Sequence, residues 1–355
     1  MFGASELIEA PGPIDEVTAA FPKSAIVGCS TAGEIEGDRI GDHGLVAAVA
    51  RFDHTDVALA HADVNRPQDS RGAGRTLAAA LDRHDLRGVL LLSDGLAVNG
   101  SELVDGINET LGHEVVVTGG LAGDGDRFVR TWVLRDGRPV QRAVSAVGLY
   151  GDRVAIGHGS RGGWDKFGPE RRVTRSEGNV LFEIDGSPAL ELYKRYLGER
   201  AAGLPATGLL FPLALRSSAS DENSVVRTLL AVDEAHQSMT FAGNIPQGWF
   251  VQLMSANFDR LIAGAGDAAL LSRGGADRPI GDVLSIAISC VGRRLVLGER
   301  VEEELEATIE SLPRGARQVG FYSYGEISPH ANGRCDLHNQ TMTLTAITET
   351  ERLAA

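Results

Sequence analysis

The sequence predicts an α/β protein of two domains, built from mixed, largely antiparallel sheets covered by helices. Three observations predict this class. At 355 residues the chain is long for a single hydrophobic core. Short apolar runs are interspersed with amphipathic segments, the pattern of an α/β fold. Tight turns such as Asp136-Gly137 join neighbouring strands, which excludes a purely parallel sheet.

Charge and cysteine content restrict the class of protein. The net charge of −14 argues against binding nucleic acid or anionic membranes, which both require a basic face. No run of 18 apolar residues exists, and the N-terminal residues lack the basic flank and apolar core of a signal peptide. The three cysteines, Cys29, Cys290 and Cys335, form no disulfide framework, so we expect a cytoplasmic protein.

The first half of the chain contains two bends rich in small residues. A helix over 14–20 ends near Pro22 and precedes the bend from Gly28 to Glu34. The second bend, GGLAGDG, spans 119–125 and contains Asp124. Helices are predicted over 72–83 and from Asn99, which should form a capping box with Glu102. Strands are predicted over 45–52, 57–62, 88–92, 115–118, 144–150 and 154–158.

The second half begins after a polar, glycine-rich stretch, 159–171, which is expected to be irregular. We therefore predict domains over 1–158 and 186–348, joined by a connecting segment over 159–185. A helix is expected to begin with Ser187 as cap and to end at Gly198. Another over 301–312 should direct its five glutamates to water. Further elements are a helix over 258–271 and strands over 208–215, 225–232, 248–254, 284–291 and 341–347.

One pattern occurs twice. The string G-x-x-x-x-G-E-I runs from Gly28 to Ile35 and again from Gly320 to Ile327. In both places a helix and a proline precede it. The shared spacing and flanking order predict an internal pseudo-repeat.

Three familiar motifs do not support a function. The G-x-G-x-x-G string from Gly157 to Gly162 is not followed by a helix, so it does not indicate a dinucleotide site. Neither a phosphate-binding Walker loop nor a G-x-S-x-G nucleophile elbow occurs. His330, Cys335 and His338 are one ligand short of a zinc site, so no metal site is predicted. Haem needs only one axial ligand, and the spacing does not exclude it.

Several residues have two interpretations. Cys29 and Cys290 are reactive thiols or small buried residues. Glu34 and Glu326 hold a cationic group such as an amine, or cap neighbouring backbone amides. Arg293 is suited to binding a carboxylate through its planar guanidinium.

Six strings together resemble one family. They are GCSTAGEI, SDGLAVNGSEL, GGLAGDG, SCVGRRLVLGER, GFYSYGEISP and LHNQT, and in this order they resemble the FIST proteins. These proteins carry a FIST N-terminal and a FIST C-terminal domain. The resemblance implies a sensory module rather than an enzyme, and a longer first strand than residues 1–5 provide.

The resemblance also implies a small ligand, with an amino-acid-like metabolite proposed, and output through a histidine kinase or a cyclic-di-GMP enzyme. The resemblance leaves open whether the protein forms a homo-oligomer. The alternatives are a haem-binding nitric-oxide sensor and a cysteine-dependent hydrolase that uses Cys29 or Cys290. We expect the pocket where the glycine-rich turns converge. The predicted ligand-binding residues are Cys29, Ser30, Thr31, Glu34, Asp124, Cys290, Arg293, Tyr324, Glu326, Asn339 and Thr341.

Overall fold

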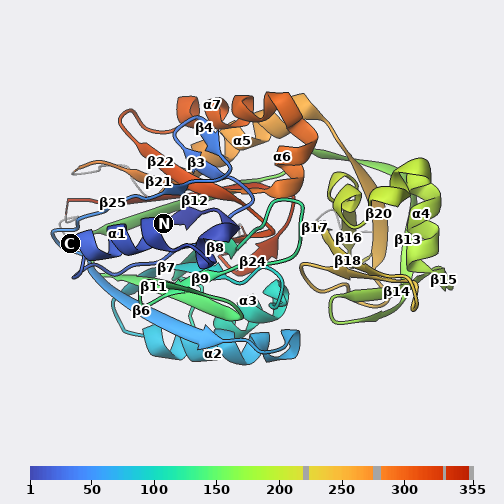
Figure 1. The fold of residues 1–355 in the computed structure, drawn as a ribbon, viewed down its shortest axis with the longest axis horizontal. Coiled ribbons are helices and arrows are strands. Elements are labelled where there is room, and N and C mark those ends of the chain that lie inside the picture. Colours follow the sequence, from blue (N-terminus) through green and yellow to red (C-terminus); the bar gives the residue numbers. More distant parts are fainter. Residues whose placement is uncertain (219–223, 275–280, 331–332, 352–355) are drawn as a thin grey trace.

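The computed structural model describes residues 1–218, 224–274, 281–330 and 333–351, and it confirms the mixed α/β class. Figure 1 shows a large body and a smaller lobe. The lobe is one sheet in the order β17-β16-β20-β13-β14-β19-β18, with β15 paired to β14 and helix α4 against it. Its elements are β13 (Trp164–Glu177), β14 (Val180–Ile184), β15 (Ser187–Pro188), α4 (Ala189–Leu197), β16 (Leu213–Arg216), β17 (Val225–Arg227), β18 (Leu229–Asp233), β19 (Ser238–Phe241) and β20 (Phe250–Ala256).

The body contains three strand–helix–strand units, each with two parallel strands. The pseudo-repeat therefore has three copies rather than two, and the bend around Asp124 belongs to the middle one in chain order. The units are β1 (Phe2–Gly3), α1 (Gly12–Ala20) and β2 (Cys29–Ser30); β7 (Leu86–Ser93), α3 (Gly100–Asn108) and β8 (Val116–Leu121); and β21 (Leu284–Cys290), α6 (Val291–Leu297), α7 (Val301–Ser311) and β22 (Arg317–Ser323).

Each unit sends the hairpin that follows its second strand into the sheet of another unit. The hairpin of β3 (Glu34–Glu36) and β4 (Arg39–Gly41) pairs with β22. The hairpin of β9 (Val133–Arg135) and β10 (Arg138–Val140) pairs with β2. The hairpin of β23 (Gly325–Pro329) and β24 (Cys335–His338) pairs with β8. This cyclic exchange makes the three sheets interdependent.

After its hairpin the chain returns to its own unit and pairs antiparallel with the first strand. These returning strands are β5 (Leu45–Val46) on β1, β11 (Ala143–Tyr150) on β7 and β25 (Met342–Glu349) on β21. Two of the sheets have a further edge strand. Strand β6 (Asp56–Asp63) pairs with β11, and β12 (Val154–Arg161) pairs with β25. Helices α2 (Ser70–Leu81) and α3 cover one side of the body, and α5 (Phe258–Ser272) and α7 the other (Figure 1).

A closed ring of three backbone hydrogen bonds joins the units where their second strands end. The Ala32 N–H donates to the Tyr322 carbonyl at 2.8 Å, and the Tyr324 N–H to the Leu121 carbonyl at 3.2 Å. The Gly123 N–H donates to the Ser30 carbonyl at 3.0 Å, which closes the ring. Residues Ala32, Gly123 and Tyr324 are therefore equivalent.

The structure corrects several predictions of secondary structure. The strand predicted over 45–52 ends at Val46, because no strand lies beside the residues that follow. The stretch 159–171 is not irregular: it completes β12 and begins β13 in two antiparallel ladders. Ser187 does not cap a helix but pairs in β15, and α4 begins at Ala189. The division into 1–158 and 186–348 stays a prediction.

Two side chains also differ from expectation. Asn99 caps α3 through Ser101 and Glu102 N–H groups, but the Glu102 side chain turns to Arg71, so the capping box is incomplete. Glu304 is one of the five glutamates predicted to face water, and it is fully buried. It faces inward because it meets the buried guanidinium of Arg293.

The threefold arrangement depends on glycine at one equivalent position in each second strand. A Cβ on Gly119 would lie 1.8 Å from the Leu91 carbonyl oxygen, and on Gly320 1.7 Å from that of Ala287. We expect Gly119→Ala and Gly320→Ala each to lower the free energy of unfolding by about 1–3 kcal/mol or more, since the paired strands must separate. Urea unfolding measures this.

The matched control is Gly72→Ala in α2, where a Cβ meets nothing within 4 Å. It should stabilise the protein by about 0.5–1 kcal/mol, since alanine is the better helix former. Equal stability of all three variants would contradict the close approach of the strands.

Candidate functional site

The eleven predicted residues converge at the carboxyl ends of the parallel strands, where the backbone ring lies. Ten of them are buried and Thr341 is half-buried. None of them lines either of the two large cavities in the described part of the chain. The glycine-rich turns therefore meet as expected, but they meet in a packed hydrogen-bond network.

The carboxylates of this network close their own turns. Glu34 accepts from the Thr31 hydroxyl at 2.5 Å and from the Gly44 N–H at 3.2 Å. Glu326 repeats this arrangement with the Ser323 hydroxyl at 2.5 Å and the Thr341 N–H and hydroxyl at 3.1 and 2.9 Å. These contacts match the capping interpretation.

Asp124 holds the remaining turn in the same way, by accepting hydrogen bonds. It accepts from the Ser5 hydroxyl at 2.5 Å and from the N–H groups of Val129 and Arg130. Arg127 forms an ion pair with it at 2.6 Å. All three turns are thus held by an acidic side chain, although Asp124 stands one position earlier in its turn than Glu34 and Glu326 do in theirs.

Burial changes the titration of the two glutamates. It raises the pKa of Glu34, and it raises the pKa of Glu326 to about 8. Hydrogen bonds from Thr31 and Ser323 oppose these shifts. Near neutral pH a substantial part of Glu326 is therefore protonated and can itself donate a hydrogen bond.

Arg293 is fully occupied by protein groups. Its guanidinium pairs with Glu304 at 2.7 Å and donates to the carbonyls of Gly162 and Leu261 at 3.1 and 2.8 Å. Glu304 also accepts from Ser289 and Tyr322. The role of Arg293 as a ligand clamp stays a prediction, and in this structure the pair joins α6 to α7.

The cysteines are closed off from solvent. Cys29 and Cys290 are completely buried, and Cys335 is 3% exposed. Burial raises the pKa of all three thiols above the ordinary value. A thiol in this state is a poor nucleophile, because the thiolate is the reactive form.

The seam between the lobe and the body contains functional candidates that the sequence did not reveal. The lobe residue Thr228 donates its N–H to Asn339 Oδ1 at 3.2 Å. Its hydroxyl accepts from Gln340 Nε2 at 3.1 Å and lies 3.9 Å from Cys290 Sγ. Asn339, Gln340 and Cys290 of the body thus all lie against Thr228 of the lobe.

Arg227 is the second element of the seam. Only 4% exposed, it donates to the carbonyls of Leu337 and Asn244 and to the Ser101 hydroxyl, at 3.1–3.3 Å. Among the described residues no carboxylate lies within ion-pair distance of it, although the charge of Asp336 acts on it, and burial lowers its pKa. A buried guanidinium that has neutral hydrogen-bond acceptors and no carboxylate in contact is costly, because a charge at a distance compensates it only in part.

Gln340 is the third element. It is fully buried, its φ is +64°, and its Oε1 has no hydrogen-bond partner in the described structure. A strained backbone and an unsatisfied buried acceptor are features of functional sites. The charged residue inside the predicted strand 225–232 was the one sequence signal that pointed to this seam.

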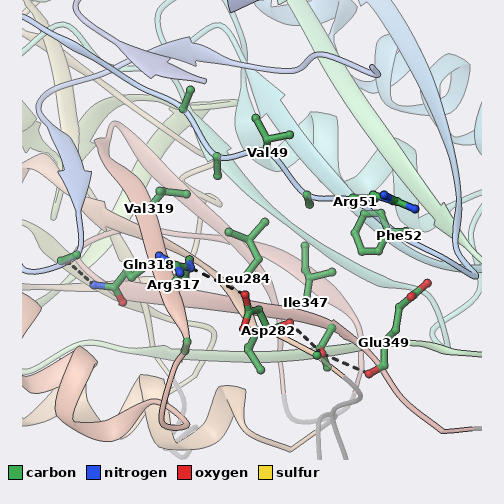
Figure 2. A pocket seen from close by; sticks show the side chains of 18 of the residues that line it. Val49, Arg51, Phe52, Asp282, Leu284, Arg317, Gln318, Val319, Ile347 and Glu349 are labelled. Carbon is green, nitrogen blue, oxygen red and sulfur yellow. Dashed lines mark hydrogen bonds and ion pairs between the residues drawn. The ribbon is translucent and has the colours of Figure 1, made fainter. Parts of the chain in front are cut away.

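The two large cavities lie at the opposite ends of the parallel strands. One, of about 760 Å³, is bounded by residues 47–53 and by Leu284, Val319 and Ile347 (Figure 2). The other, of about 500 Å³, shares residues 47–50 and is mostly apolar. Among the described residues no three His, Cys, Asp or Glu side chains are grouped for a metal ion. No helix that the structure describes has both the length and the apolarity to cross a membrane.

Comparison with known proteins covers nearly the whole chain. Residues 1–187 match the model of the FIST N domain and residues 189–329 that of the FIST C domain. An uncharacterized protein of Mycobacterium tuberculosis, found in strains CDC 1551 / Oshkosh and ATCC 25618 / H37Rv, is 27% identical over 344 residues, covering 92% of this chain and 85% of the relative.

A crystal structure of a cyanuric acid hydrolase from A. caulinodans aligns with 83% of this chain and 99% of its own. The identity is 10% and the TM-score 0.21, too low to support a shared fold or activity.

Protonation of Glu326 should couple stability to pH. Because burial raises its pKa to about 8 from 4.5, its contribution to stability is complete below pH 4.5 and is lost as pH rises through 8. Over that interval the free energy of unfolding of the wild type should fall relative to Glu326→Gln, as measured by urea unfolding. Glu36→Gln, at an exposed site, is the control and should follow the wild type. Parallel profiles for wild type and Glu326→Gln would contradict the prediction.

The thiols should be inert in the folded protein. We expect a thiol reagent such as DTNB to modify none of Cys29, Cys290 and Cys335 until guanidinium unfolds the chain, since all three are buried. Rapid modification of one native thiol would instead support a nucleophilic cysteine.

Proposed function

The chain belongs to the FIST family, whose domains are associated with sensing in signal transduction, and on this premise we propose that it binds an amino-acid-like ligand between lobe and body. The observation that carries the proposal is that the seam holds both a buried cation that forms no ion pair among the described residues and a buried acceptor that has no donor there. In the described part of the chain Arg227 donates to neutral acceptors and forms no ion pair, with Asp336 acting on it from farther away, and Gln340 Oε1 accepts no hydrogen bond.

The chemistry of these two groups fits the two ends of an amino acid. A guanidinium binds a carboxylate through paired, charge-assisted hydrogen bonds. An amide oxygen accepts from an amine. Thr228 connects the two, because it follows Arg227 in the chain and accepts from Gln340. The predicted residues Cys290, Glu326 and Asn339 would form the surrounding wall.

The seam is suited to opening. Over the residues that the structure describes, the chain passes between body and lobe twice, beside Trp164 and beside Ala256. At these crossings an apolar cluster joins the two parts, with Trp164 and Met254 against Leu261. On the side of α3 polar contacts, as between Asn244 and Glu102, lie beside the lobe residues Leu209, Leu230 and Ala242, which pack into the hydrophobic core of the body. We propose that the lobe turns about the apolar cluster and admits the ligand at the polar side.

The output would pass to a partner protein, and by resemblance we propose a histidine kinase or a cyclic-di-GMP enzyme. A ligand that closes the seam would change the surface formed by lobe and body together. The three free cysteines support a cytoplasmic setting for this exchange.

The alternatives receive less support. Neither large cavity is lined by a His, Cys or Tyr side chain, so haem bound there would lack these axial ligands. A cysteine hydrolase would need a thiolate and a base, whereas burial raises the pKa of Cys29 and Cys290. We therefore propose a binding protein and not an enzyme.

A panel of amino acids and related metabolites, followed by calorimetry on the compounds that raise the melting temperature, tests the proposal. Arg227→Gln should weaken binding by about 30-fold or more, the cost of losing one partner of a buried charge pair. Gln340→Met should weaken the binding of ligands that carry an amine and leave the binding of ligands without an amine unchanged. A ligand that binds wild type and both variants equally would place the site elsewhere.

Arg175→Gln is the control, because this arginine lies in the lobe, is exposed and pairs with Glu183. It should bind like the wild type. If no member of the panel shifts the melting temperature, the amino-acid-like ligand is wrong.

A further inference from the structure

One buried guanidinium of the body contacts both crossings at which the described chain passes between body and lobe. Arg293 of α6 is fully buried, and its Nη1 donates to the Gly162 carbonyl at 3.1 Å. Its Nη2 donates to the Leu261 carbonyl at 2.8 Å. Gly162 lies just before Trp164, where β13 begins, and Leu261 lies near the start of α5, which follows β20. A single side chain thus holds the two crossings together.

Glycine lets the backbones of the two crossings approach each other at this point. A Cβ on Gly163, whose φ is +140°, would lie 2.5 Å from the Arg260 carbonyl oxygen. A Cβ on Gly264 would lie 2.3 Å from the Gly162 carbonyl oxygen. Any other residue at these two positions would push the backbones apart, so glycine stands where the crossings touch.

A polar bridge joins the same crossings on the side of the lobe. Asp165 of β13 accepts from Asn257 Nδ2 at 3.1 Å and forms an ion pair with Arg260. Asn257 also caps α5, because its side chain accepts from the Arg260 N–H. The crossings are therefore tied to each other, and Arg293 ties both of them to the body.

A second buried group holds Arg293 in place. Glu304 of α7 accepts from Arg293 Nε at 3.0 Å and from Nη2 at 2.7 Å, and its other oxygen accepts from Ser289 and Tyr322. A planar guanidinium that a carboxylate holds along one edge presents its other N–H groups in a fixed fork. Arg293 can therefore donate to two carbonyls at once, which the single ammonium of a lysine could not do in the same geometry.

The crossings and α6 lead directly to the candidate ligand groups. The Trp164 indole N–H donates to the backbone carbonyl of Gln340 at 3.1 Å. Cys290, the residue before α6, lies 3.9 Å through its Sγ from the Thr228 hydroxyl of the lobe. In Figure 1, α6 lies at the edge of the body that faces the lobe. A change in how the crossings rest on Arg293 would shift Arg227 and Thr228 relative to Gln340.

We propose that Arg293 is a positioning residue for the seam: it fixes the point at which the lobe joins the body, and so sets how Arg227 faces Gln340. When the lobe turns, it turns about this point. The inference rests on the proposed function for the turning of the lobe, and it requires no contact between Arg293 and the ligand.

Pulsed electron paramagnetic resonance on the full chain, without ligand, measures the arrangement of lobe and body. Spin labels are attached at Ala79→Cys on α2 and at Arg195→Cys on α4, two exposed sites. The native cysteines are buried, and treatment of the unsubstituted protein with the reagent verifies that they stay unlabelled. The labelled protein should give one narrow distribution of distances. Arg293→Lys should widen it at least about twofold, because lysine cannot hold Glu304 and both carbonyls.

Two further variants separate this role from a contribution to folding. Arg273→Lys is the matched control, because the Arg273 guanidinium also donates to two backbone carbonyls, those of Ser311 and Leu312, but lies at the opposite end of α5 from the crossing. It should leave the distribution unchanged. Glu304→Gln keeps both carbonyl contacts of Arg293, so it should lower the melting temperature without widening the distribution.

If melting curves show that Arg293→Lys does not fold, Arg293→Met combined with Glu304→Leu removes both buried ions together and should widen the distribution in the same way. An unchanged distribution would overturn the proposal, and so would equal widening in Arg273→Lys or Glu304→Gln. Failure of both Arg293 variants to fold would overturn it too, because it would assign Arg293 to folding. Since no ligand is added, an amino-acid panel without a binder would contradict the proposed function and leave this result standing.

Discussion

The structure depends on the ring of three backbone hydrogen bonds that closes around the ends of the second strands. Each bond joins a turn of one unit to a strand of another, through Ala32, Gly123 and Tyr324. No unit completes its own sheet, because its hairpin lies in another one. The polar cluster at the carboxyl ends exists only when all three units are in place.

This constraint distinguishes buried polar residues that hold the turns of the ring from buried polar residues that are candidates for binding a ligand. Glu34, Asp124 and Glu326 hold equivalent turns, so their first task is to keep the ring closed. Other buried polar groups lie at the seam between the lobe and the body, where Arg227 donates to both parts. Among the described residues Arg227 is buried without an ion pair, and Gln340 Oε1 is buried without a donor. A ligand-binding site is expected where buried polar groups with incomplete partners lower the stability of the free protein.

Local patterns in the sequence predicted the class of fold and most helices, because these depend on periodicity and turn chemistry. They also marked Glu34 and Glu326 as counterparts, since the repeated tripeptide lies in equivalent turns. The exchange of hairpins was not predictable, because pairing between distant strands leaves no local signal. Arg227 was missed because one charge in a strand acquires meaning only through its burial, and Glu304 because helical periodicity does not reveal a buried partner.

The central claim is that the lobe and the body hold a ligand carboxylate between them. A crystal structure of the protein grown with the tightest-binding amino acid tests this most directly. The account predicts the carboxylate at hydrogen-bond distance, about 3 Å, from the Arg227 guanidinium, with a donor facing Gln340 Oε1. Ligand bound instead in the cavities beside residues 47–53, with the seam unchanged, would contradict it.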